Sequence, residues 1–207
     1  MERYLSIGKG FFCRQYLPHL VVTAVFCCLS GCFVSFRNLD RLQAAKVMEM
    51  YAAFTGILLL TPLFLPEQDK ELWLLEKSKA TSLWKLYLLR LLAATAALAV
   101  AVTVFIQRME QGNSHFDGRA LWVGSFCEIF FLGSIGFFVS GITNQAVLGY
   151  MVSVVYFFAN IGGSRYLGSF ALFQMMKGGY GFVVPMAGAA AVLVAFGIGL
   201  REWLAVR

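Results

Sequence analysis

The chain has 207 residues, of which 59% are hydrophobic and 14% are charged, and its formal net charge is +6. Soluble domains carry about 25% charged residues, so this composition excludes an ordinary soluble domain and indicates an integral membrane protein. The basic residues are scattered along the chain, which argues against a nucleic-acid-binding protein. At about 20 residues per span, there is room for about five to seven spans joined by short loops.

The N-terminal stretch combines basic and aromatic side chains with two glycines. This pattern predicts an amphipathic interfacial helix over residues 1–16, and a basic tail that only fixes the orientation of the chain is an equal alternative. A first span is predicted over about 17–36. Pro18 suits the first turn of that helix, where its missing N–H costs nothing.

The densest run of charge lies between the second and third spans. The second span is predicted over about 47–65 and ends near Pro62 and Pro66, and the third is predicted over about 88–107. A charged helix between two spans cannot lie in hydrocarbon, so residues 67–87 are expected in water or at the headgroups. We interpret them as a cytoplasmic handle for another protein.

Three more spans are predicted over about 120–142, 146–163 and 182–200. The stretch 164–181, between the last two, is aromatic and punctuated by glycines. It is too broken to span and too apolar for an ordinary loop, so it is predicted to form a re-entrant segment of short helices. The fold class is therefore all-α: a polytopic integral membrane protein with six transmembrane helices in one domain, 1–207.

Small residues recur at a spacing of four in two of these spans, a pattern that lets helices approach closely in a membrane. The residues are Ala93, Ala97 and Ala101 in the third span, and Ala187, Ala191, Ala195 and Gly199 in the sixth.

The basic residues predict an orientation. With six spans both termini lie on one side, and placing them in the cytoplasm puts ten of the 17 Lys and Arg residues inside and seven outside. This bias follows the positive-inside rule. The expected location is the cell (plasma) membrane, with both termini cytoplasmic.

Few residues within the spans could carry chemistry. Glu128, near the middle of the fourth span, is either a polar point on a substrate pathway or proton site, or a structural hydrogen-bonding group. Asn160 is expected to form an interhelical hydrogen bond and is a second candidate for the pathway. Glu49 is expected to pair with Lys46, one turn away.

The sequence contains none of the common catalytic signatures. It has no P-loop, no HExxH and no GxSxG motif, and Asp117-Gly118-Arg119 lacks the later aspartates of a phosphotransferase motif. No spacing of His and Cys is typical of a metal site. The chain is therefore not expected to be an enzyme by itself.

The charged stretch resembles a motif of type-2 ATP-binding-cassette (ABC) transporter permeases. The resemblance rests on Glu67-x-Asp69-Lys70-Glu71, then Leu72-x-Leu74-Leu75-x-x-Ser78-x-Ala80-x-Ser82-x-Trp84-Lys85, then Leu88-x-Arg90-Leu91-Leu92. The family's amphipathic N-terminal helix, six spans and re-entrant helices before the last span are similar to those predicted here. This chain lacks the family's glycine, at Glu71 or Leu72, and has Ala80 in place of its proline.

The resemblance implies the transmembrane subunit of an ABC exporter. Two permease chains, identical or related, would form the substrate pathway, and a separate cytoplasmic ATPase would bind ATP and Mg, so no cofactor is expected in this chain. The implied cargo is a peptide, an antibiotic or a lipid-like amphipath. The residues implied to contact the ATPase are Glu71, Glu76, Lys77, Ser78, Lys79, Thr81 and Ser82. The alternative is an ATPase-independent carrier or channel that uses Glu128.

Overall fold

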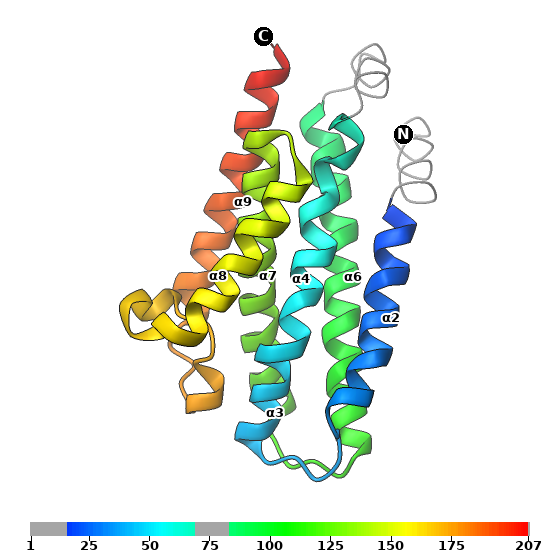
Figure 1. The fold of residues 1–207 in the computed structure, drawn as a ribbon, viewed down its shortest axis with the longest axis vertical. Helices are drawn as coiled ribbons and strands as arrows, with labels where there is room; N and C mark the ends of the chain where they lie inside the picture. The colour runs from blue at the N-terminus through cyan, green and yellow to red at the C-terminus, as the bar shows by residue number, and fades with distance from the viewer. Residues whose placement is uncertain (1–15, 69–82, 207) are drawn as a thin grey trace.

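The computed structural model describes residues 16–68 and 83–206, and within these ranges the chain is all-helical, with no strand (Figure 1). The predicted interfacial helix over 1–16 lies outside the described residues, apart from Tyr16. The residues expected to contact the ATPase, from Glu71 to Ser82, also lie outside them. The structure thus leaves both of these predictions open.

The second predicted span is one helical rod that runs from Arg41 to Gln68 without a break. Asp40 starts it, because its carboxylate accepts the Arg41 N–H (2.7 Å) in a capping box with Gln43. The rod comprises α3 (Arg41–Val47), the π-helix η2 (Met48–Ala52), α4 (Ala53–Leu60) and the 3₁₀-helix η3 (Thr61–Gln68). It is longer than predicted and is the most buried of the long apolar helices.

Within residues 16–68 and 83–206, five helical stretches are long and apolar enough to cross a membrane, which makes the chain a multi-pass membrane protein. One is the rod 41–68, and the others lie in α6 (Leu83–Gln111), α7 (Gly118–Thr143), α8 (Ala146–Leu167) and α9 (Val183–Val206). The first predicted span forms α2 (Leu17–Phe33), an apolar helix of 17 residues, with proline in its first turn as predicted.

Helix α7 lies at the centre of the bundle and packs against α4, α8 and α9. Its crossing with α4 is close: a Cβ on Gly56 would collide with the backbone of Ile129, and a Cβ on Gly133 with that of Gly56. The small residues predicted to pack in the sixth span, from Ala187 to Gly199, are instead exposed on the outside of the described bundle. The close crossings therefore use glycines of α4, α7 and α8, since a Cβ on Gly149 of α8 would also collide with the backbone of Gly136.

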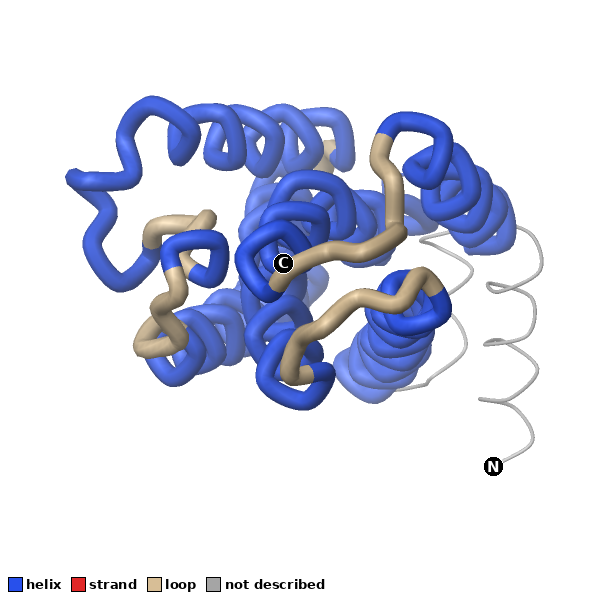
Figure 2. Tube along the Cα trace, turned by 90° about the horizontal axis from the view of Figure 1, so that it is seen from below, coloured by secondary structure: helices blue, strands red, loops and turns tan. Residues whose placement is uncertain are grey.

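Two loops are paired at the lower end of the bundle, which Figure 2 shows from below. The N–H of Asn38 donates to the carbonyl of Gly112 (2.8 Å), and the N–H of His115 donates to that of Leu39 (3.1 Å). Next to them, Asp117 caps α7 by accepting the Arg119 N–H (3.1 Å). The Asp-Gly-Arg sequence thus begins a helix here.

The stretch 164–181 is broken, as its glycines predicted. Helix α8 kinks at Gly163 and ends at Leu167, and two single 3₁₀ turns follow, η4 (Gly168–Phe170) and η5 (Met175–Lys177). Figure 1 shows this part (yellow to orange) beside α7 and α3, on the far side of the bundle from α2.

Candidate functional site

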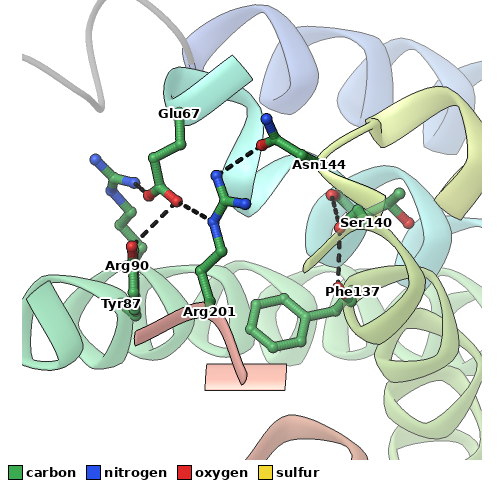
Figure 3. A network of polar contacts seen from close by, with 8 residues as sticks. Glu67, Tyr87, Arg90, Phe137, Ser140, Asn144 and Arg201 are labelled. Atoms are coloured by element: carbon green, nitrogen blue, oxygen red, sulfur yellow. Dashed lines mark hydrogen bonds and ion pairs between the residues drawn. The ribbon is translucent and has the colours of Figure 1, made fainter. Parts of the chain in front are cut away.

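A buried cluster of charged side chains occupies the upper end of the bundle (Figure 3). Glu67 is at its centre: its Oε1 accepts from Arg90 Nη1 (3.0 Å), and its Oε2 accepts from Arg201 Nε (2.8 Å) and from the Tyr87 hydroxyl (3.1 Å). Arg201 also donates from Nη2 to Asn144 Oδ1 (2.6 Å). We call Glu67, Tyr87, Arg90, Asn144 and Arg201 the Glu67 cluster.

The cluster connects four parts of the chain that are far apart in sequence. Glu67 ends the rod 41–68, Arg90 lies in the third turn of α6, and Arg201 lies near the end of α9. Asn144 is the left-handed C-cap of α7 (φ 54°), a conformation that asparagine tolerates well. This backbone shape presents its amide oxygen to Arg201.

Residues 67–87 were predicted to lie in water or at the headgroups, and the two ends of this range, Glu67 and Tyr87, are buried within the bundle. Glu67, Arg90 and Tyr87 are only 3%, 2% and 2% exposed, whereas Trp84 is exposed. The charges can be buried because each has an oppositely charged partner, and Glu67 and Arg201 have further hydrogen bonds to Tyr87 and Asn144. Glu67, Tyr87 and Arg90 are therefore not on an exposed surface, and the handle of the proposal below is taken as residues 69–82.

A second polar cluster lies toward the lower end and holds residues 171–176 against the bundle. Its acceptors are Glu49 of η2, Glu128 of α7 and Asn160 of α8. The N–H of Leu172 donates to Asn160 Oδ1 (2.9 Å), that of Phe173 to Glu128 Oε1 (3.3 Å), and those of Met175 and Met176 to Glu49 Oε1 and Oε2 (2.6 and 3.0 Å).

The predicted pairing of Glu49 with Lys46 is wrong. Glu49 is 1% exposed and its carboxylate accepts the two backbone N–H groups of residues 175 and 176, whereas the Lys46 side chain is exposed. Two N–H donors in a fixed position satisfy a buried carboxylate better than a lysine at the surface. The partner lies 126 residues away in sequence, so the local spacing could not reveal it.

Glu128 and Asn160 are both buried, and both accept hydrogen bonds from residues 171–176, which we call the segment. For Glu128 this agrees with a hydrogen-bonding role, although its donor is a backbone N–H of the segment rather than another span. The expected interhelical bond of Asn160 is wrong: its Nδ2 donates to Tyr156 O on its own helix (2.8 Å), and its Oδ1 accepts from Leu172 of the segment. The two predicted pathway residues thus meet at one segment.

The acceptors lie well inside the bundle. At about 1.5 Å per residue along a helix, Glu49 is roughly 12 Å from the start of the rod at Arg41, and Glu128 is roughly 15 Å from the start of α7 at Gly118. Residues 171–176 can approach α7 because Gly124 has no side chain, and Met175 and Tyr180 occupy the space where a Cβ would lie. The segment backbone therefore reaches deep between helices.

The side chains of the two clusters bind other groups of the protein. Among the described residues no group of three or more His, Cys, Asp or Glu side chains could hold a metal ion. Sequence reasoning did not single out Glu67, Tyr87 or Arg201 as site residues. The predicted topology could have indicated that they meet. It places the ends of the second and sixth spans and the start of the third at the same membrane level.

Comparison with known proteins finds no matching family model, no similar curated protein and no similar solved structure.

Proposed function

We propose that this chain is the transmembrane subunit of an ABC exporter, driven by a separate cytoplasmic ATPase that contacts residues 69–82. The proposal includes six spans with α2 as the first, a re-entrant segment at residues 164–181, and cytoplasmic termini in the plasma membrane. Cargo and pathway remain those implied by the resemblance: a peptide, antibiotic or lipid-like amphipath moved between two permease chains.

The observation that carries the proposal is the Glu67 cluster. Glu67 directly precedes the handle, and Tyr87 and Arg90 follow it, so both flanks of residues 69–82 meet at one buried carboxylate. Arg201 adds α9 to the same carboxylate. A force applied to the handle would therefore reach three helices at once, as the resemblance requires of a segment that an ATPase moves.

The burial of the cluster makes it suitable for transmitting such a force. Breaking a buried ion pair by removing one partner costs about 3–5 kcal/mol, so the pairs resist separation. The helices that meet there would then move together rather than slide independently. Rigid-body motion of this kind is one of the common ways in which switching proteins transmit a local change.

The proposal is tested by purifying the tagged chain from its native membrane in mild detergent and identifying bound proteins by mass spectrometry. The expected result is a stoichiometric P-loop ATPase that is lost in the double variant Lys77→Glu/Lys79→Glu. The matched control is Arg37→Glu/Lys46→Glu, which reverses two exposed charges at the lower end and should retain the ATPase. Recovery of the chain without any ATPase would contradict the proposal.

A second candidate function is an ATPase-independent carrier or channel. The observation that favours it is the pair of buried carboxyl groups, Glu49 and Glu128, because ionisable residues within spans commonly mark ion or proton paths. This candidate predicts pH-dependent flux in liposomes that contain this chain alone. The variant Glu128→Gln keeps an oxygen that can accept the Phe173 N–H but cannot exchange a proton, so it should abolish that flux.

A further inference from the structure

Glu49 and Glu128 come from different helices, and their carboxyl groups meet inside the bundle. Each residue is 1% exposed, and the two side chains lie close enough for a hydrogen bond between them. Glu49 lies in the π-helix η2, and π-helical turns occur often at functional sites. Two acids therefore share one buried location.

The surroundings supply little positive charge to this location. Among the described residues neither carboxyl group forms an ion pair with Lys or Arg. The charged or titratable groups that act on the pair from neighbouring elements are Lys177 of η5, which faces Glu49 and is exposed to solvent, and Tyr156 of α8, which faces Glu128. Two negative charges side by side in an apolar bundle would be strongly unfavourable.

One oxygen of the pair has no partner. Glu128 Oε2 is fully buried and makes no hydrogen bond, and the hydroxyl of Ser125, one turn earlier on α7, is also buried without one. Both oxygens of Glu49, in contrast, accept backbone N–H groups at 2.6 and 3.0 Å, as an ionised carboxylate does. The geometry thus fits an ionised Glu49 and leaves room for a hydrogen on Oε2 of Glu128.

We propose that Glu49 and Glu128 form a binding site for one proton, carried on Glu128, and that this proton holds residues 171–176 against the bundle. The inference uses the same two acids as the second candidate function but requires no transport, so the infrared band and the liposome flux can fail independently. When the proton is bound, a single negative charge remains, on Glu49, and two backbone N–H groups satisfy it. When the proton leaves, the ionised Glu128 is the better acceptor for the Phe173 N–H, but two carboxylates now repel each other in the apolar bundle. This repulsion drives the two side chains apart and breaks their bonds to Phe173, Met175 and Met176.

The backbone of Phe173 supports this role for Glu128. Its φ is +65°, a left-handed conformation that is strained for a residue other than glycine. Such strain persists only where the surroundings hold it, and the hydrogen bond from its N–H to Glu128 is one of the contacts that do so. Loss of the proton would therefore release the segment at a strained residue.

The test uses the full-length purified chain in lipid nanodiscs, with infrared spectroscopy of the carboxyl C=O stretch. We expect a band from a protonated acid at neutral pH that shifts in D₂O, is absent in Glu128→Gln, and remains in Glu110→Gln, which alters an exposed acid. Absence of the band in the wild-type chain, or its persistence in Glu128→Gln, would overturn the proposal. Displacement of the band by sodium at constant pH would overturn it in favour of a cation site.

Hydrogen exchange tests the effect on the segment. Raising the pH until the acid band disappears should reduce the protection of the 173, 175 and 176 amides about tenfold or more beyond the change in intrinsic exchange rate, since bonds to charged groups contribute that much. In Glu128→Gln, which loses no proton, protection should stay constant over the same range. Parallel loss of protection in both proteins would show that the proton does not hold the segment.

Discussion

The Glu67 cluster and the pair of Glu49 and Glu128 both bury carboxyl groups in the bundle, but the groups that satisfy these carboxyls differ. In each region a glutamate is almost completely removed from water. Glu67 forms ion pairs with two arginines and accepts a tyrosine hydroxyl, and these three partners are side chains of helices. Glu49 and Glu128 instead accept backbone N–H groups from a non-helical segment.

The difference shows what each region can do. Opposite charges keep their attraction over the whole pH range in which both are ionised, so the Glu67 cluster is a permanent connection between helices. The acid pair lacks such partners among the described residues, so its stability depends on how many protons it holds. The Glu67 cluster is suited to transmitting force between helices, and the acid pair is suited to responding to pH.

The largest expected effect is at Glu67. Glu67→Gln leaves two buried arginines without their counter-charge and should lower the free energy of unfolding by about 3–5 kcal/mol. The measurement is an SDS titration of the purified protein in mild detergent, followed by circular dichroism. Glu110→Gln, at an exposed position, should stay within about 0.5 kcal/mol of the wild type. A Glu67→Gln protein as stable as this control would remove the distinction between the two regions.

A smaller effect is expected at Glu49. Glu49→Ala removes both acceptors of the Met175 and Met176 N–H groups and should cost about 2–3 kcal/mol in the same titration, because hydrogen bonds to a charged group contribute about 1.5–3 kcal/mol. Glu49→Gln keeps one acceptor oxygen and should cost about half as much. If both variants unfold like the wild type, the segment does not depend on this carboxylate.

The crossing of α4 and α7, which lies between the two regions, provides a test of packing without charge. Gly133→Ala places a methyl group against the backbone of Gly56 and should destabilise the protein by about 2 kcal/mol. Gly188→Ala on α9 has no atom within 4 Å of the added carbon and should change little. Equal unfolding free energies of the two variants would show that the crossing is looser than described.

The smallest effect is expected at Asn160. Asn160→Ala removes one neutral acceptor from the Leu172 N–H and should cost about 1 kcal/mol. The hydrogen-exchange protection of Leu172 should fall, while that of Met175 and Met176 should remain. Loss of protection along the whole segment would mean that Asn160, rather than the acid pair, is its main support.

The sequence predicts the helices well because apolar length and glycine or proline breaks are local features. The fourth span was expected over about 120–142 and is found within α7, and the broken stretch 164–181 ends α8 and forms two 3₁₀ turns. The rod 41–68 is longer than predicted, because its ends include polar residues that a hydropathy argument excludes. At one end Glu67 is buried by tertiary contacts, and at the other the Asp40 cap starts the helix although Arg41, Gln43 and Lys46 are exposed.

The partners of the buried acids could not be derived in the same way. Glu49 pairs with residues 175 and 176, and Glu67 with Arg201, across more than a hundred residues in each case. Local reasoning assigned Glu49 to Lys46 and assigned Glu67 to a solvated charged run. In a membrane bundle, the depth at which a charge lies decides its partner, and that depth follows from the packing of all the helices.

The most direct test of the central claim compares ATPase capture by three forms of the chain purified from native membranes. The account predicts that the wild type retains a P-loop ATPase in stoichiometric amount and that Lys77→Glu/Lys79→Glu loses it. Glu67→Gln should retain the ATPase but lose substrate transport coupled to ATP hydrolysis, because the handle is present while its connection to α9 is broken. Recovery of the wild-type chain as an oligomer without an ATPase would contradict the account.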